Sequence, residues 1–179
     1  MIVGHSSTGR IWGHQGVYFM IDFLLGLRGH RVAPDCDDVP MDTIPVDYVA
    51  LVIDYSTRAS KLNGQIIHQC SGAHAWRIGR ILDAARALLR ERGVETPSVD
   101  RLPLGSFEEH LAGLRARGSR LYEALLQFHL FCQDRMEFDN QSATALLEPE
   151  GIVLPPVERY FDCVLSRYWN DRRAALEHV

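Results

Sequence analysis

The residues best suited to chemistry lie in the first 74 positions of the chain. This stretch holds five of the eight histidines and seven aspartates, but no glutamate. The glutamates all follow, between Glu91 and Glu177. Imidazole and carboxylate groups act as acids, bases and metal ligands. The distribution therefore predicts a polar site in the first part of the chain and ordinary amphipathic helices in the second.

One candidate is a loop near the start, residues 4–10, which reads Gly-His-Ser-Ser-Thr-Gly-Arg. Its two glycines have the spacing of a phosphate-binding loop, but Arg10 holds the lysine position and Ile11 replaces the magnesium-binding hydroxyl. The loop therefore predicts a generic phosphate or carboxylate site rather than an ATPase. The alternative is a Ser/Thr-rich turn with a capping role. The anion-binding candidates are Ser6, Ser7, Thr8, Gly9 and Arg10.

The same letters begin like the nucleophile elbow of a serine hydrolase. The second glycine of that motif would fall at position 8, which is Thr8, and only three residues precede the loop. The sequence therefore does not predict an elbow here.

A second candidate is a metal site at the ends of three predicted strands. Ligands of open parallel sheets bind beyond the carboxyl ends of the strands. If the strands are parallel, His5, Asp35, Asp37 and Asp54 meet at one edge, where they could hold a divalent metal ion such as zinc, iron or manganese. The alternative is that the aspartates form a solvated turn and that His5 is a cap.

The same edge could instead carry acid–base catalysis. His5 or His14 would be the base, and Asp35 or Asp54 would orient it or bind the metal. Arg10 would clamp an anionic substrate. The catalytic candidates are thus His5, His14, Asp35 and Asp54.

A third candidate is the short cluster His68, Cys70 and His74. On a continuous helix His68 and Cys70 would point apart, so convergence requires a loop at positions 68–72, which Gly72 favours. The cluster could hold zinc, or Cys70 could be a nucleophile with a histidine base. The alternative is a helix start with a buried thiol.

The elements that would position these residues are predicted from hydrophobic patterning. Strands are expected at 1–3, 30–33 and 49–53, the last because its continuous apolar run is typical of a strand buried on both faces. A helix at 15–28, ended by Gly29, completes a right-handed βαβ unit. The predicted fold class is α/β, with a small parallel or mixed sheet and a helical C-terminal half.

The rest of the chain reads as helices and connections. Helices are expected at 73–92, from a capping box at Ser106 and Glu109 to 117, at 119–138, and after Pro155-Pro156. Segments 95–103 and 139–151 are expected to be a linker and a polar loop. We expect residues 1–95 to form an α/β core and residues 96–179 a helical extension packed on it.

Composition excludes several classes of function. The net charge of −4 does not favour a nucleic-acid or membrane partner, and no apolar run is long enough to span a bilayer. The four cysteines are widely spaced, and the start lacks the pattern of a signal peptide. These features indicate a cytoplasmic protein with reduced thiols.

Three readings of function remain open. The first is a small α/β enzyme that hydrolyses, or transfers a group on, an anionic or metal-bound small molecule. The second is a non-catalytic accessory or adaptor subunit of a larger enzyme complex, which would bind a protein partner through the aromatic stripe of its C-terminal helices. The third is a regulatory domain that binds a metabolite without turnover.

Overall fold

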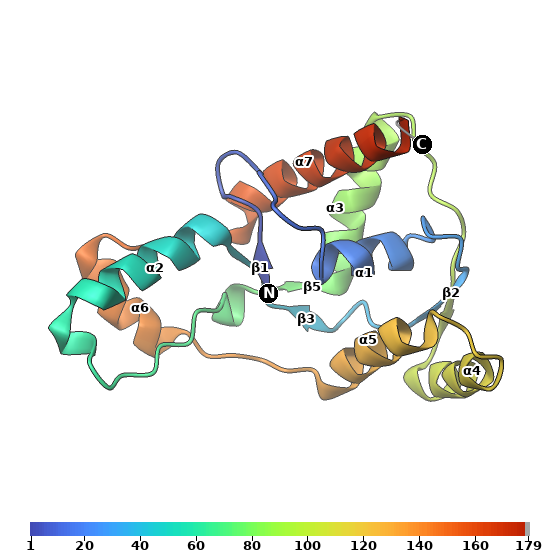
Figure 1. The fold of residues 1–179 in the computed structure, drawn as a ribbon, viewed down its shortest axis with the longest axis horizontal. Helices are drawn as coiled ribbons and strands as arrows, with labels where there is room; N and C mark the ends of the chain where they lie inside the picture. The colour runs from blue at the N-terminus through green and yellow to red at the C-terminus, as the bar shows by residue number, and fades with distance from the viewer. Residues whose placement is uncertain (178–179) are drawn as a thin grey trace. The chain divides into compact units, whose positions relative to one another are not determined.

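The computed structural model describes residues 1–177, and the side chains of residues 1–173. The fold is mixed α/β, as predicted, with many helices and a few short parallel strands (Figure 1). The chain forms two compact units, each made of segments that are far apart in sequence. Unit 1 contains Met1–Val17, Met41–Trp76 and the chain from Glu137 onward, and unit 2 contains Tyr18–Pro40 and Arg77–Met136. Position 95, the expected boundary, therefore lies inside unit 2.

Unit 1 is built around one pair of parallel strands. Ile2 of β1 pairs with Ile44 of β4, and Val3 pairs with Pro45. Three α-helices and three short turns of 3-10 helix complete this unit. In chain order its elements are β1 (Ile2–Val3), β4 (Ile44–Pro45), α2 (Val46–Arg58), η1 (Ser60–Leu62), η2 (Gly72–His74), α6 (Gln141–Leu147), η3 (Glu148–Glu150) and α7 (Val157–Glu177).

Helix α2 occupies the segment predicted as the third strand, so that prediction was wrong. The buried residues of the helix are Tyr48 and Val52, whose spacing of four is that of one helix face. Leu51 and Ile53 are each 55% exposed, so the apolar run is not buried on two faces. An uninterrupted apolar run does not by itself distinguish a strand from a helix.

Helix α7 begins directly after the two prolines, as predicted. Its aromatic stripe is an internal packing face, since its first six residues are buried in the structure and Phe161 contacts Trp76 with ring centroids 5.4 Å apart. Because these side chains are covered, they do not form the external docking surface that the accessory-subunit reading assigned to the C-terminal helices. The buried residues of the stripe are Val157, Tyr160, Phe161, Val164, Leu165 and Tyr168.

Unit 2 has its own parallel pair, in which Val32–Pro34 of β2 pairs with Asp100–Leu102 of β6. Strand β6 lies in the segment expected to be a linker. The chain passes between the units at the start of α1, within the two-residue strands β3 (Pro40–Met41) and β5 (Trp76–Arg77), and after Met136. The helices of this unit are α1 (Val17–Leu24), α3 (Ile78–Glu91), α4 (Leu104–Ala116) and α5 (Tyr122–Asp134).

Two helix ends differ from the prediction for local reasons. Gly26, at φ +68°, ends α1 instead of Gly29, because its N–H donates to the Phe23 carbonyl while the Leu27 N–H donates to that of Asp22. Helix α4 starts at Leu104 after Pro103, so Ser106 and Glu109 do not form a capping box. Helix α6 likewise replaces the polar loop expected at 139–151. Within residues 1–177, no helix has the length and hydropathy needed to cross a membrane.

Candidate functional site

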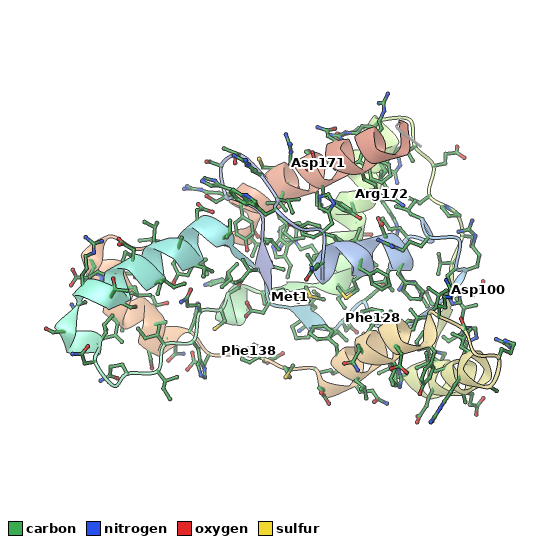
Figure 2. The ribbon with its side chains drawn as sticks, viewed as in Figure 1. Met1, Asp100, Phe128, Phe138, Asp171 and Arg172 are labelled. Atoms are coloured by element: carbon green, nitrogen blue, oxygen red, sulfur yellow. The ribbon has the colours of Figure 1, made fainter. Side chains whose placement is uncertain are left out.

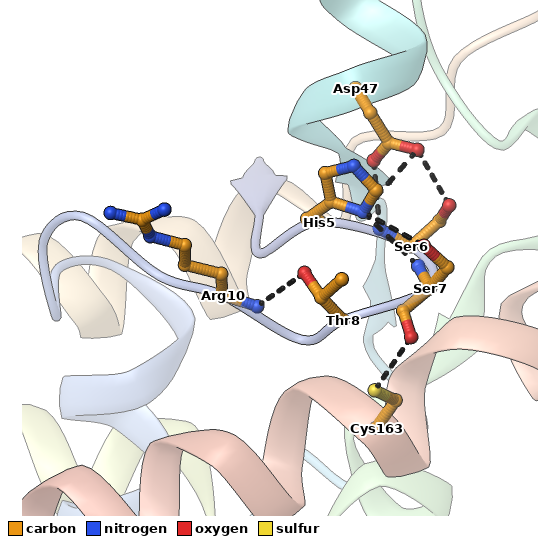
Figure 3. A network of polar contacts seen from close by, with 7 residues as sticks. All are labelled: His5, Ser6, Ser7, Thr8, Arg10, Asp47 and Cys163. Carbon is orange, nitrogen blue, oxygen red and sulfur yellow. Dashed lines mark hydrogen bonds and ion pairs between the residues drawn. The ribbon is translucent and has the colours of Figure 1, made fainter.

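The loop at residues 4–10 already holds a carboxylate, that of Asp47 in the first turn of α2 (Figure 3). The Ser6 N–H donates to Oδ1 of Asp47 at 2.7 Å, and the Ser6 hydroxyl donates to Oδ2 at 2.6 Å. Burial alone raises the pKa of Asp47, but the Ser6 hydrogen bonds and nearby His5 outweigh it and hold the pKa below 3.8. Two donors of the loop, the N–H and the hydroxyl of Ser6, therefore stabilise an internal carboxylate.

The remaining loop donors are also largely used within the loop. The His5 N–H donates to the Arg10 carbonyl at 3.0 Å, and the Gly9 N–H donates to the His5 carbonyl at 2.8 Å. Gly9, at φ +65°, has no room for a side chain, because an added Cβ would lie 2.3 Å from the carbonyl oxygen of Cys163 on α7. The Cys163 thiol donates to the Ser7 carbonyl at 3.6 Å. The loop is thus held together by its own hydrogen bonds and packs against Cys163 on α7.

His5 does not form a relay of the serine-hydrolase kind. The Ser7 hydroxyl lies 3.3 Å from Nδ1 of His5, and Oδ2 of Asp47 lies 3.9 Å from the same nitrogen. In a catalytic triad the serine and the carboxylate contact opposite ring nitrogens. The Ser7 N–H also donates to Nδ1 at 3.2 Å, so this nitrogen accepts up to two hydrogen bonds from one residue.

The other predicted residues of unit 1 lie in separate surroundings. Nε2 of His14 lies 3.8 Å from Oδ2 of Asp171 on α7. Asp171 is labelled in Figure 2. Arg10 places its guanidinium over the exposed Trp12 ring, 4.7 Å from the centroid. Asp54, expected at a strand end, lies on α2 and pairs with Arg58 on the helix surface.

Asp35 and Asp37 belong to unit 2, whereas His5 and Asp54 belong to unit 1. The Asp35 N–H donates to the Leu102 carbonyl at 2.6 Å, and Asp37 lies 3.8 Å from the Arg101 guanidinium. Among the residues that the structure describes, no group of three His, Cys, Asp or Glu side chains is close enough to hold a metal ion.

The cluster His68, Cys70 and His74 is not brought together as a metal site either. The Cys70 thiol donates to the His68 carbonyl at 3.8 Å, and burial raises the pKa of this thiol. A raised pKa keeps the sulfur protonated, which argues against a nucleophile. His74 has a different place, because it lines a pocket in unit 1.

This pocket has a volume of about 490 Å³ and is formed by α6, the segment that follows it, and parts of two earlier segments of unit 1. Its wall combines hydroxyl, amide, imidazole and carboxylate groups with aliphatic side chains. Neither lysine nor arginine is present among the lining residues, which are Tyr48, Ser71, His74, Asn140, Gln141, Thr144, Ala145, Glu148, Ile152, Leu154, Pro155, Pro156 and Val157.

The pocket wall is anchored by a buried polar network. The Ser71 N–H donates to the carboxylate of Asp42 at 2.8 Å, and the Ser71 hydroxyl donates to the Thr43 carbonyl. The Tyr160 hydroxyl donates to the same carbonyl at 2.7 Å, and burial raises the pKa of Tyr160 to about 12. Asn140 donates to the Cys70 carbonyl at 3.2 Å. These bonds fix the positions of two walls of the pocket.

Sequence reasoning missed most of this pocket because it treated residues 139–151 as a loop. A signal was present in the sequence, since Ala143 and Leu147 are four residues apart and both buried on α6. They pack with Tyr48 and Val52 of α2. That pattern could have predicted a short helix with Thr144 and Glu148 on a neighbouring face.

The fold, but not the sequence, is similar to that of a known protein. No protein-family model matches the chain, and no curated protein matches its sequence. A crystal structure of the terminal R domain from the myxalamid PKS-NRPS biosynthetic pathway matches with a TM-score of 0.60 and 20% identity. The match covers 99% of this chain and 43% of that one, so this chain spans less than half its length. The chain therefore shares its fold with part of an R domain.

Proposed function

We propose that this chain is a ligand-binding, non-catalytic part of a biosynthetic enzyme, and that polypeptide outside these 179 residues supplies the rest of the catalytic domain. The observation that carries the proposal is the likeness to part of the R domain, in which nearly the whole chain corresponds to 43% of a larger protein. The surroundings of His5, Asp47 and Asp54 also favour it, since none of them forms a complete catalytic arrangement.

The chemistry of the pocket identifies the class of ligand. Asn140, Gln141 and Thr144 offer both donors and acceptors, whereas Ile152 and Leu154 offer an apolar wall. Glu148 contributes negative charge, and the lining contains neither lysine nor arginine to offset it. An anionic ligand would lose hydration there without gaining a lysine or arginine partner. The ligand we propose is a neutral or cationic molecule with an amide and an aliphatic arm.

Two matched probes test this ligand class. N-acetyl-leucinamide and N-acetyl-leucine differ chiefly in the charge of one end, and their binding to the isotope-labelled chain can be followed by NMR. The amide should shift the side-chain signals of Asn140 and Gln141 in a saturable manner, and the carboxylate should bind at least several-fold more weakly. Equal binding of both probes, or shifts confined to other regions, would refute the proposal.

A pair of variants on one helix shows whether the probe occupies this pocket. Thr144→Tyr fills the cavity from α6, whereas Ser142→Tyr places the same side chain at an exposed position that does not line it. The first variant should abolish binding of the amide probe, and the second should leave it unchanged. Binding that survives Thr144→Tyr would place the probe elsewhere.

A second candidate function is hydrolysis or group transfer at the loop of residues 4–10. The contact of 3.3 Å between the Ser7 hydroxyl and Nδ1 of His5 favours it, because a base within this distance could accept the hydroxyl proton. The test is hydrolysis of p-nitrophenyl acetate by the purified chain. Ser7→Ala should remove the activity, Ser142→Ala should not, and equal rates in both variants would exclude Ser7 as the nucleophile.

A further inference from the structure

Two buried residues in the wall of the unit 1 pocket, Tyr48 and Ser71, carry hydroxyl groups. The Ser71 hydroxyl is paired, because it donates to the Thr43 carbonyl. Tyr48 is 6% exposed, and its hydroxyl has no hydrogen-bond partner among residues 1–173. Because buried polar groups are normally paired, the Tyr48 hydroxyl is a donor that a ligand in the pocket could use.

Apolar packing holds the Tyr48 side chain in place without occupying its hydroxyl. The side chain belongs to one cluster with Ala143 and Leu147 of α6. Ile152 and Leu154 pack against this cluster and also line the pocket. An aliphatic wall therefore adjoins the hydroxyl, and a ligand that fits both has an acceptor atom next to an aliphatic group.

The charge near Tyr48 restricts the kind of acceptor that fits. Burial, followed by nearby Cys70 and Glu148, raises the pKa of Tyr48, so the hydroxyl keeps its proton at neutral pH and can donate it in a hydrogen bond. Glu148 also lines the pocket, and its negative charge repels a carboxylate or phosphate oxygen. A neutral carbonyl oxygen accepts a hydrogen bond without bringing a second negative charge.

We infer that Tyr48 determines the specificity of this pocket by donating a hydrogen bond from its hydroxyl to the carbonyl oxygen of an amide ligand. The inference rests on the proposed function and adds to it the atom that recognises the amide. It also gives the ligand an orientation, with its carbonyl directed at Tyr48 and its aliphatic arm against Ile152 and Leu154. A carboxamide with a branched aliphatic group beside its carbonyl meets both conditions.

NMR titration of the Tyr48→Phe chain with N-acetyl-leucinamide tests this role. Phenylalanine keeps the ring and its packing and removes only the hydroxyl, so the variant should remain folded, which circular dichroism checks. We expect the dissociation constant to rise about fivefold or more, as for the loss of one hydrogen bond. Tyr55→Phe is the matched control on the same helix, because Tyr55 does not line the pocket and its hydroxyl bonds with Lys61. It should leave the affinity unchanged.

A change of acceptor atom gives a second readout that general damage to the pocket would not reproduce. N-methylisovaleramide and its thioamide differ in one atom, and sulfur is the weaker acceptor. The wild-type chain should bind the amide several-fold more tightly, and Tyr48→Phe should lose this preference. Unchanged affinity for N-acetyl-leucinamide in Tyr48→Phe, or a preference that persists there, would overturn the role of Tyr48 and leave the proposed function standing. Absence of binding to the wild-type chain would overturn both.

Discussion

The two units stabilise their buried polar groups in different ways. In unit 1 the buried hydroxyls of Thr43, Ser71 and Tyr160 are linked to one another and to backbone carbonyls. In unit 2 the buried polar side chains are Asp22, whose carboxylate lies 3.3 Å from the Arg28 guanidinium, and His129, whose ring packs against Phe107. His129 is 2% exposed, and both of its ring nitrogens are without a hydrogen-bond partner among the described residues.

This difference shows which forces specify each unit. Hydrogen bonds are directional, so the network of unit 1 fixes how the segments around Thr43, Ser71 and Tyr160 approach each other. Aromatic packing tolerates more arrangements, and the core of unit 2 depends on filled volume instead. Pocket walls require fixed positions, which is consistent with the pocket lying in unit 1.

The largest effect should come from removing an aromatic ring at the centre of unit 2. Phe107 is fully buried and contacts His110 and His129. Phe107→Ala should destabilise unit 2 by roughly 3–5 kcal/mol, because it removes apolar contacts and leaves a cavity. Urea unfolding followed by circular dichroism measures the loss. All three tryptophans lie in unit 1, so an equal shift of the fluorescence transition would show that the units unfold together.

A smaller loss should follow from breaking the network of unit 1. Tyr160→Phe removes the hydroxyl that donates to the Thr43 carbonyl. The expected cost is about 1–3 kcal/mol, the range for a buried acceptor that loses a donor. Tryptophan fluorescence during urea unfolding measures this loss in the free energy of unfolding. A change below a few tenths of a kcal/mol would mean that the network is not what specifies unit 1.

Substitution of His129 should raise the free energy of unfolding instead of lowering it. His129→Leu replaces a buried imidazole, whose ring nitrogens have no hydrogen-bond partner among the described residues, with an aliphatic side chain, and should stabilise the chain by about 1 kcal/mol. His68→Leu, at an exposed position, should change stability by less than about 0.5 kcal/mol. Destabilisation by His129→Leu would reveal a polar role for this ring and remove the contrast between the units.

The smallest effect should be a pH dependence specific to unit 2. Burial lowers the pKa of His30 and of His110 below 6.5, and each is lowered further by its charged neighbour, His110 and Arg117 respectively. The unfolded chain therefore binds more protons, and stability falls as the pH drops from about 6.5 through the folded values. Circular dichroism melts from pH 7.5 to 5 should show this trend. The double variant His30→Phe/His110→Phe should show a flatter profile.

Part of the fold could be predicted because its signals are local. The strand at Ile2–Val3, the helix after Pro155-Pro156 and the end of the helix expected at 73–92, just before Gly93, follow from hydrophobic runs and from proline and glycine. Helix α2 could not be identified from its apolar run, because its exposed Leu51 and Ile53 look like core residues in the sequence. Exposure depends on what packs against the segment, which a single sequence does not contain.

The candidate site shows the same limit. The sequence predicted a polar, anion-binding loop at residues 4–10, but it did not identify the Asp47 carboxylate that the loop contacts. Asp47 is 41 positions from Ser6, and their contact depends on the pairing of β1 with β4. The pocket around Asn140 was missed for a related reason, since its walls come from segments about 65 to 110 positions apart.

The order in which the chain is synthesised has different consequences for the two units. Residues 77–136 make up most of unit 2 and follow one another without interruption, so the unit can fold soon after they leave the ribosome. In unit 1, by contrast, Ser7 and Thr43 accept hydrogen bonds from Cys163 and Tyr160, which lie on α7 and are synthesised more than 110 residues later. Unit 1 therefore has a high contact order and should be the slower of the two to fold. Until α7 is made, the apolar surface that it covers is exposed to chaperones and to other nascent chains.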